Sequence, residues 1–435
     1  MPTTTPTFSD SWSLVSTFTH LTIRIAKRGT GAIAILLAGL FALTVVVPAQ
    51  AQHFQLLYQF PLAKTGNDPS ALLNAGGNFY GTTVNGGKSN VGTVFELSGT
   101  GVLTNLYSFN HNSTDGRNPT IGALVRDKAG NLYGTTQNGG NQSCVVFTRN
   151  GCGTVFKLTP SGKETILHSF AGGPGDGANP LAGLTMDSAG NLYGTTYVGG
   201  IGCPGTGCGT VYKVTPSGVE TVLYSFTGGT DGANPYYVGL VIDSAGNLYG
   251  TAGSGGNLSC LGSRGNGCGV VFKVDPSGKE SVLYAFAGGA NGGGPSSGVA
   301  RDSQGNLYGT LTSGGSGCRT CGLVFKVDTA GNETVLHDFT EEEIQPALSA
   351  SNLIVDPAGN LYGTTFYGGS LSDGTVFEIS SQGEYTLLHT FDQLDGIWPQ
   401  AGLLRDAAGN LFGTTSQGGI DSCNLGCGVI FKITP

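Results

Sequence analysis

The sequence is short of several kinds of residue, and each shortage excludes a class of protein. Charged residues make up only 11% of the 435 residues, and the formal net charge is −8. Nucleic acids and anionic membranes are bound by clusters of Lys and Arg, so we expect neither as a partner. Methionine occurs only at Met1 and Met186, which excludes a methionine-rich binding surface.

Long apolar runs and helical periodicity are missing after residue 51. Before it, basic residues between Arg24 and Arg28 precede an uncharged run over residues 31–47. Ala49 and Ala51 then match a small-x-small cleavage site. This order is typical of a secretory signal peptide, and an uncleaved N-terminal anchor is the alternative because the run just reaches membrane-spanning length. We expect an exported protein, located outside the cell, at its surface or in the periplasm.

What is abundant is repetition. The phrase Gly-Asn-Leu-Tyr-Gly-Thr recurs with small variations in seven units, and its aromatic position returns every 50 to 60 residues. That position is occupied by Tyr80, Tyr133, Tyr193, Tyr249, Tyr308, Tyr362 and Phe412. A fixed period of this size indicates a repeat architecture. A repeated unit specifies a scaffold, whereas a localised activity needs residues that occur once.

Each unit contains four short runs of β-forming residues. In the third unit these runs are residues 181–187, 192–196, 210–214 and 220–226, and clusters of Gly, Pro, Asn and Ser separate them. Such runs are typical of strands joined by tight turns. Four strands in each unit of this length are typical of a β-propeller blade.

The two ends of the repeated region complement each other. It begins with a fourth strand, residues 53–60, and ends with a third strand, residues 428–435, so the N-terminal strand can complete the last blade and cover both open edges. We therefore predict an all-β, seven-bladed β-propeller with four antiparallel strands per blade. It forms one domain over residues 52–435, after a signal peptide or anchor over residues 1–51. A linear β-solenoid is the alternative, although it would need shorter repeats.

The repeated unit also has recognisable sequence motifs. The segments GNLYGTT, GTVFKLTPSG, TVLYSF and DGANP resemble the GloVer tandem repeat of exported bacterial proteins, the choice-of-anchor group. The resemblance covers residues 53–435 in all seven units. It implies export and a repeat architecture, and it gives no information about catalysis. Members often carry a C-terminal anchor, which we do not find in this sequence.

Ten cysteines lie in the loops between second and third strands. They form five local pairs: Cys144 with Cys152, Cys203 with Cys208, Cys260 with Cys268, Cys318 with Cys321, and Cys423 with Cys427. In an exported chain this pattern predicts five disulfides that stiffen glycine-rich loops. The Cys318–Cys321 spacing also fits a redox pair, and the pairs could bind zinc. A redox pair would need a strand-to-helix context, which is missing here. A zinc site would need four clustered ligands.

The strand order gives the propeller two faces. The tight turns share one face, and the cysteine loops share the other, the link face, with the links between blades. Asp115, Asp176 and Asp231 begin Asp-Gly-x-Asn-Pro links, and Asp395 begins a degenerate copy. The structural interpretation is that Asp caps its turn, Gly supplies a positive φ and Pro starts the next strand. The alternative is a ring of oxygen ligands near the axial opening for calcium or sugar hydroxyls.

Residues that break the repeat are the candidates for a binding site. Trp398, Tyr236 and Tyr237 lie in links, where exposed aromatic rings suit stacking on sugars and buried ones suit ordinary packing. The acidic run over residues 341–343 is either a solvated turn or a weak candidate for the paired carboxylates of a glycosidase.

No Ser-His-Asp set, metal triad or phosphate loop can be assembled from the sequence. We therefore predict no catalytic residue, no metal ligand and no cofactor apart from possible calcium. The leading prediction is a monomeric, non-catalytic module that binds carbohydrate or a cell-surface or extracellular protein through its link face. The alternatives are a polysaccharide lyase or hydrolase with its site in the axial depression, and a structural module of the cell envelope.

Overall fold

The structure is a computed structural model that describes residues 52–61, 66–112, 114–146, 149–237, 239–262, 265–315, 321–340, 352–419 and 426–434. The predicted leader, Cys318, Cys423 and the acidic run over residues 341–343 lie outside the described residues. Residues Gln50–Pro435 form one compact unit. Within the described ranges, no helix has the length and apolar character needed to cross a membrane.

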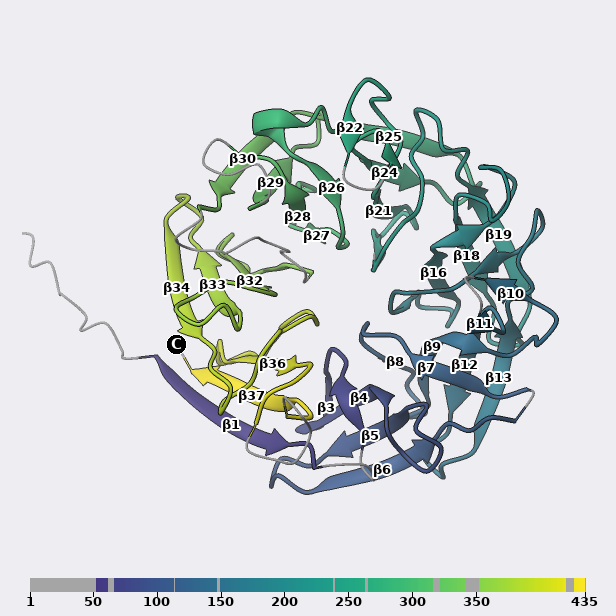
Figure 1. Cartoon of the computed structure of the whole chain (residues 1–435), viewed down its shortest axis with the longest axis vertical. Helices are drawn as coiled ribbons and strands as arrows, with labels where there is room; N and C mark the ends of the chain where they lie inside the picture. Colours follow the sequence, from purple (N-terminus) through teal and green to yellow (C-terminus); the bar gives the residue numbers. More distant parts are fainter. Residues whose placement is uncertain are drawn as a thin grey trace, which may run out of the picture. The chain divides into compact units, whose positions relative to one another are not determined.

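Seven small antiparallel sheets form a ring (Figure 1), which confirms the predicted all-β, seven-bladed propeller. From the axis outward, the first three blades are β3 (Leu73–Ala75), β4 (Asn78–Asn85), β5 (Thr93–Leu97), β6 (Leu103–Ser108); β8 (Val125–Arg126), β9 (Leu132–Gly139), β12 (Thr154–Leu158), β13 (Glu164–Ser169); and β15 (Thr185–Met186), β16 (Leu192–Thr196), β18 (Thr210–Val214), β19 (Glu220–Ser225).

The other four blades have the same order. They are β20 (Val241–Ile242), β21 (Leu248–Ala252), β24 (Val270–Val274), β25 (Glu280–Ala285); β27 (Ala300–Arg301), β28 (Leu307–Ser313), β29 (Leu323–Val327), β30 (Glu333–Asp338); β31 (Ile354–Val355), β32 (Leu361–Thr365), β33 (Thr375–Ile379), β34 (Tyr385–Thr390); and β35 (Leu404–Arg405), β36 (Leu411–Thr415), β37 (Val429–Thr434), β1 (His53–Gln59). In the last blade, β1 pairs antiparallel with β37, with His53 opposite Thr434.

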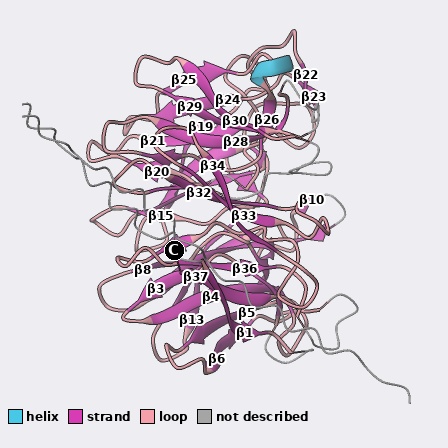
Figure 2. Ribbon diagram, turned by 90° about the vertical axis from the view of Figure 1, so that its left-hand side faces the viewer, coloured by secondary structure: helices cyan, strands magenta, loops and turns pink. Residues whose placement is uncertain are grey.

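Short elements decorate the links and loops. Link strands are β2 (Asn67–Pro69), β7 (Gly116–Pro119), β14 (Gly177–Ala178) and β26 (Gly293–Pro295), and β14 pairs with β17 (Val198–Gly199). Loop hairpins join β10 (Val145–Val146) to β11 (Arg149–Asn150) and β22 (Leu261–Gly262) to β23 (Gly265–Asn266). The 3-10 helix η1 (Gly289–Asn291) is the cyan element in Figure 2, where loops extend on both sides of the strands.

The outermost strands run along the rim of the ring rather than parallel to its axis (Figure 1). Their pairing with the third strand contains a register shift, for example between Val155 and Phe156 in β12 and between Val211 and Tyr212 in β18. A bulge increases the local twist of a strand pair. The end of one outermost strand lies close to the start of the next one; for example, the Tyr284 hydroxyl in β25 is 3.5 Å from Oε2 of Glu333, at the start of β30.

A pair of buried aromatic rings fills each junction between neighbouring blades. One ring follows an outermost strand, the other lies in the third strand of the next blade, and all are inaccessible to solvent. The pairs are Phe60–Phe95, Phe109–Phe156, Phe170–Tyr212, Phe226–Phe272, Phe286–Phe325, Phe339–Phe377 and Phe391–Phe431, with centroids 5.0 to 5.5 Å apart. Edge-to-face rings add about 0.5–1.5 kcal/mol each to the gain from burial.

Candidate functional site

Three of the predicted disulfides are confirmed. Cys144 is bonded to Cys152, Cys203 to Cys208 and Cys260 to Cys268, with Cα atoms 5.6, 5.2 and 5.6 Å apart. Cys321 and Cys427 are also disulfide-bonded, while their predicted partners lie outside the described residues. Paired cysteines indicate an oxidising, extracellular type of environment.

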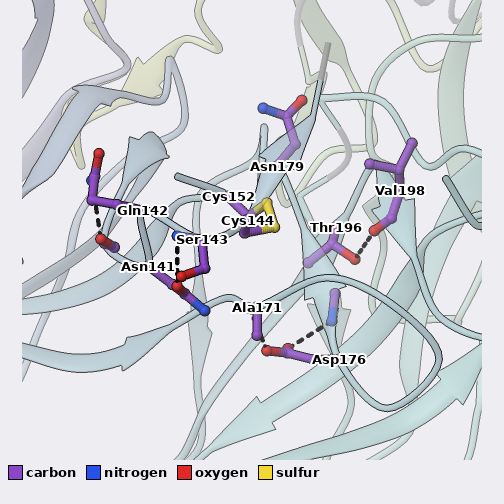
Figure 3. Close-up of a disulfide and its surroundings, with 12 residues drawn as sticks. Asn141, Gln142, Ser143, Cys144, Cys152, Ala171, Asp176, Asn179, Thr196 and Val198 are labelled. Atoms are coloured by element: carbon purple, nitrogen blue, oxygen red, sulfur yellow. Dashed lines mark hydrogen bonds between the residues drawn. A yellow bond between two sulfur atoms is a disulfide. The ribbon is translucent and has the colours of Figure 1, made fainter. Parts of the chain in front are cut away.

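Each of these three disulfides packs against the link that follows its own blade. A Cβ atom added to Gly172, Gly228 or Gly288 would lie 3.0, 2.7 or 2.6 Å from a cysteine sulfur. The Cys152 carbonyl also accepts a hydrogen bond of 2.7 Å from the amide of Asn179, and Figure 3 shows this disulfide among its neighbours. The cysteine loops and the links therefore share one face, as the sequence predicts.

The link aspartates cap their own turns. Asp115, Asp176, Asp231 and Asp395 accept backbone N–H bonds of 2.9, 2.7, 2.7 and 2.8 Å from residues that follow the outermost strand. Figure 3 shows the bond from Ala171 to Asp176. This supports the structural interpretation, with one refinement: the fourth link residue, such as Asn118 or Asn179, adopts a φ of 54° or 60°.

The contacts of these aspartates do not support the alternative, a ring of ligands near the axial opening, and their role in ligand binding stays a prediction. Each carboxylate contacts a side chain of the outermost strand, at the rim of the ring. The partners are Tyr107 at 3.1 Å from Asp115, His168 at 3.3 Å from Asp176, Tyr224 at 2.8 Å from Asp231 and His389 at 2.8 Å from Asp395. The outermost strands lie farthest from the axis, so the carboxylates are spread one per junction and do not converge.

A glutamate from the next blade joins three of these contacts. Glu164, Glu220 and Glu280 are the first residues of β13, β19 and β25. Burial, followed by repulsion from Asp115, Asp176 and Asp231 respectively, raises the pKa of each glutamate to about 7. The Oε1 atom of each is buried and has no hydrogen-bond partner among the described residues.

One of these junctions has the composition of a metal site. Ligand atoms of His168, Asp176 and Glu220 all lie within 4.8 Å of one another. This set was not predicted from the sequence, because the three residues belong to different strands and to a link. One signal for this set was present in the sequence. Each of the three residues occupies a periodic position in the repeat, and this is the junction that has a histidine at the position of His168 and a glutamate at the position of Glu220.

A cavity of about 140 Å³ lies where the segments that precede the innermost strands meet around the axis. Its described lining is mostly Gly, Ala, Leu and Ile, with Tyr237, Asn352 and Gln400 as the polar members and no carboxylate. Asn352 occupies a position where other units have Gly or Ala, and its Oδ1 accepts a 2.7 Å bond from the Gly298 amide. The cavity is therefore neutral, small and able to form hydrogen bonds.

Two aromatic clusters lie in the links, and both contain residues singled out from the sequence. Tyr236 contacts Tyr197 and Tyr237, with centroids 5.3 and 4.1 Å away. Trp398 stacks on Phe366 at 5.5 Å and meets Tyr367 edge-on. Tyr236, Tyr237 and Trp398 are half-buried. Packing thus explains part of each side chain, and their role in ligand binding stays a prediction.

A second cavity, of about 510 Å³, lies on the face of the tight turns between blades five and six. Arg301, Asp302, Tyr308 and Lys326 are among its lining residues. The aspartate accepts hydrogen bonds from Asn306 and from the Tyr308 hydroxyl. The carboxylate of Asp302 is thus engaged within its own turn and is not free to bind a ligand.

Three solved structures with a detectable likeness illustrate low identity and low TM-scores. A gluconolactonase from Xanthomonas campestris is 14% identical, with 86% of this chain and 98% of that chain covered and a TM-score of 0.39. The calcium-binding protein regucalcin from Agrobacterium tumefaciens is 12% identical, with 72% and 90% covered and a TM-score of 0.40. A Dyadobacter fermentans protein of unknown function is 10% identical, with 87% and 98% covered and a TM-score of 0.44. We infer no activity from these likenesses.

Sequence comparison identifies the repeat itself. No curated protein matches the chain. The family model described as the Gloeobacter/Verrucomicrobia repeat matches residues 40–200, 146–316 and 259–435, which together include all seven blades and confirm the resemblance carried by the repeated segments. The chain therefore belongs to the Gloeobacter/Verrucomicrobia repeat family.

Proposed function

We propose that this protein is an exported, non-catalytic module that binds carbohydrate on its link face. The ligand would contact the Tyr236 and Trp398 clusters and the axial cavity beside Tyr237. Export is supported by the leader sequence and by the disulfides, which need an oxidising compartment.

The observation that carries this proposal is the backbone of two aromatic residues. Tyr237 and Trp398 have φ values of 52° and 59°, in the left-handed region. The equivalent of Trp398 is Asn118, Asn179 or Asn234 in other links, and Asn tolerates this region whereas bulky residues do so at a cost. Strain of this kind, about 1–3 kcal/mol, is typical of functional sites.

The chemistry of the surface suits a neutral sugar. Aromatic faces stack on the apolar side of pyranose rings, and the amides of Asn352 and Gln400 can donate to and accept from hydroxyl groups. The described lining of the axial cavity contains no charged side chain, so a neutral ligand would keep its hydrogen bonds without an unpaired charge being buried.

The test is retention of the mature chain on a panel of neutral polysaccharides, with and without calcium, together with an assay for newly released reducing ends. We expect retention without release. Release of reducing ends would contradict a non-catalytic module, and the absence of retention on every polysaccharide would contradict carbohydrate binding.

Trp398→Asn separates binding from folding, because Asn is the residue that three other links use at this position. We expect binding to weaken about tenfold, the effect of losing a modest stacking contact. Relief of strain should raise the free energy of unfolding by about 1 kcal/mol. Tyr308→Phe, on the opposite face, is the matched control and should leave binding unchanged. Equal binding by wild type and Trp398→Asn would remove Trp398 from the site.

A further inference from the structure

We infer that His168, Asp176 and Glu220 form a binding site for one divalent transition-metal ion, with zinc as its probe. The site lies at the rim between blades two and three. His168 comes from β13, Asp176 from the link after it, and Glu220 from the start of β19. Their ligand atoms lie within 4.8 Å of one another, so a single ion can contact all three after small side-chain adjustments.

The donor set selects the kind of ion. One imidazole nitrogen and two carboxylate oxygens are ligands that zinc and related ions accept, whereas calcium prefers six to eight oxygens. Three protein ligands leave a coordination position for water. This proposal is therefore separate from the calcium ring considered for the link aspartates.

Two of the ligands are already held in place. The carboxylate of Asp176 accepts hydrogen bonds from the amides of Ala171 at 2.7 Å and Gly177 at 2.6 Å, one on each oxygen. The His168 ring packs edge-on against the buried Phe170, with centroids 4.8 Å apart, and its Nε2 faces Asp176 Oδ1 at 3.3 Å. An ion would thus meet oriented donors rather than mobile surface side chains.

The third ligand has an unmet requirement. Oε1 of Glu220 is buried and has no hydrogen-bond partner among the described residues, and an unpaired buried oxygen is unfavourable. A cation would satisfy this atom and offset the repulsion between Glu220 and Asp176. The side chains of His168 and Asp176 remain 19% and 15% exposed, which leaves a route for an ion to enter from solvent.

Neighbouring junctions show what is special about this one. At the equivalent place, Tyr107 interacts with Asp115 and Glu164, and Tyr224 interacts with Asp231 and Glu280. Each tyrosine donates its hydroxyl proton to the aspartate, at 3.1 and 2.8 Å. A neutral phenol is a donor there, whereas the imidazole of His168 can present a lone pair. Histidine is thus the change that converts a hydrogen-bonded cluster into a ligand set.

The junction between blades six and seven has the histidine but lacks the glutamate. His389 contacts Asp395 at 2.8 Å, as His168 contacts Asp176. The place of the glutamate is taken by Phe54, whose ring stacks on His389 with centroids 4.1 Å apart. Among the described residues, the three-ligand set is therefore complete only between blades two and three.

The experiment is a calorimetric titration of Zn²⁺ into the untagged mature chain, with its disulfides intact. Binding of Co²⁺ is followed in parallel by visible absorption, which reports coordination directly. We expect one ion per wild-type chain and a higher unfolding temperature in its presence, because an ion that binds only the folded state stabilises it.

His168→Tyr is the main variant, because Tyr107 and Tyr224 show that the scaffold accepts tyrosine at this position. Removing a direct ligand should weaken Zn²⁺ binding by about 100-fold or more, since even partners behind the ligands account for about 10–100-fold. Glu220→Gln should weaken it similarly. His389→Tyr is the matched control and should bind like wild type, with unchanged Co²⁺ absorption.

Three results would overturn the proposal. The first is the absence of saturable Zn²⁺ binding by wild type. The second is wild-type affinity in both His168→Tyr and Glu220→Gln. The third is loss of binding in His389→Tyr with retention in His168→Tyr, which would place the ion at another junction. Circular dichroism of each variant separates loss of the site from loss of the fold.

Discussion

Two neighbouring junctions, between blades two and three and between blades three and four, have nearly the same architecture and different chemistry. Both contain a buried aromatic pair at 5.0 or 5.1 Å, a disulfide packed on a glycine, and an aspartate that caps its link. They differ at His168 against Tyr224 and at Tyr212 against Phe272. The comparison teaches that the repeat fixes the scaffold, while one or two side chains per junction decide what it can do.

The shared part of the two junctions should be the most sensitive to mutation. Phe170→Ala and Phe226→Ala each remove a fully buried ring from an edge-to-face pair. We expect each to lower the free energy of unfolding by about 3–5 kcal/mol. Denaturant unfolding of both variants measures this. Costs that differ by more than about 2 kcal/mol would contradict the equivalence of the junctions, given the usual spread for such changes.

Removing a disulfide should have the next largest effect. The Cys144–Cys152 bond closes a longer loop than the Cys203–Cys208 bond, with sequence separations of 8 and 5. In the loop-entropy description, replacing both cysteines of a pair with Ala costs about 2.5 kcal/mol for the first and about 2 kcal/mol for the second. Thermal unfolding under non-reducing conditions tests the order. A larger loss for the shorter loop would show that packing on the link glycine outweighs loop entropy.

The junction glutamates should make stability depend on pH. Burial, then repulsion from Asp231, raises the pKa of Glu280 from 4.5 to about 7. The folded chain therefore keeps a proton that the unfolded chain releases, and stability is lost as pH rises across this window. Glu280→Gln removes that loss, so at about pH 8 it should be more stable than wild type by about 1–2 kcal/mol, after allowance for partial exposure.

Glu220→Gln sharpens the same measurement at the other junction. Its pKa is also raised to about 7, by burial first and Asp176 second, but His168 acts in the opposite direction. The net rise in pKa is the same for both glutamates, so in metal-free buffer we expect the same sign as for Glu280→Gln and a gain of similar size. Urea unfolding at about pH 4 and about pH 8 provides both values. A destabilised variant at the higher pH would contradict the raised pKa.

The smallest effect concerns the core hydroxyl that distinguishes the two junctions. Tyr212 is fully buried, and its hydroxyl oxygen has no hydrogen-bond partner among the described residues. Tyr212→Phe should raise the free energy of unfolding by about 1 kcal/mol, because an unsatisfied polar group leaves the core. Phe272→Tyr should cost a similar amount at the next junction. Destabilisation by Tyr212→Phe would indicate a partner for the hydroxyl.

Much of the scaffold was predictable because its determinants are local. The period, the short β-forming runs and the turn sequences specify the strands, and cysteines such as Cys144 and Cys152 occur as a local pair within one loop. The arrangement of His168 next to Glu220 was not predictable, because it depends on the bulge and twist that carry the outermost strands along the rim. The contacts of the link aspartates with side chains of the outermost strands were also not predictable from the sequence.

The candidate binding surface was predictable only in part. Trp398 and Tyr237 stand out in the sequence as aromatic residues in links. Aromatic side chains at such positions indicate a surface on which sugars can stack. Their left-handed φ values and their stacking on Phe366 and Tyr236 depend on the conformation of the link. Asn352 was missed because a single polar residue in an apolar segment has no period to mark it.

The contact between disulfide and link glycine also restricts which residues the link can hold. Blades two, three and four, which hold the three described disulfides, continue from their last phenylalanine into a Gly-Gly pair, as at Gly172-Gly173. Blades one and six have neither cysteines in the loop nor this pair, and Asn110 and Asp392 follow the phenylalanine. Blades five and seven hold the disulfide-bonded Cys321 and Cys427, yet Thr340 and Pro61 follow their last phenylalanine and no Gly-Gly pair comes after. Since a Cβ at Gly288 would lie 2.6 Å from a sulfur, the disulfides of blades two, three and four leave little room for a side chain at the first glycine of the pair.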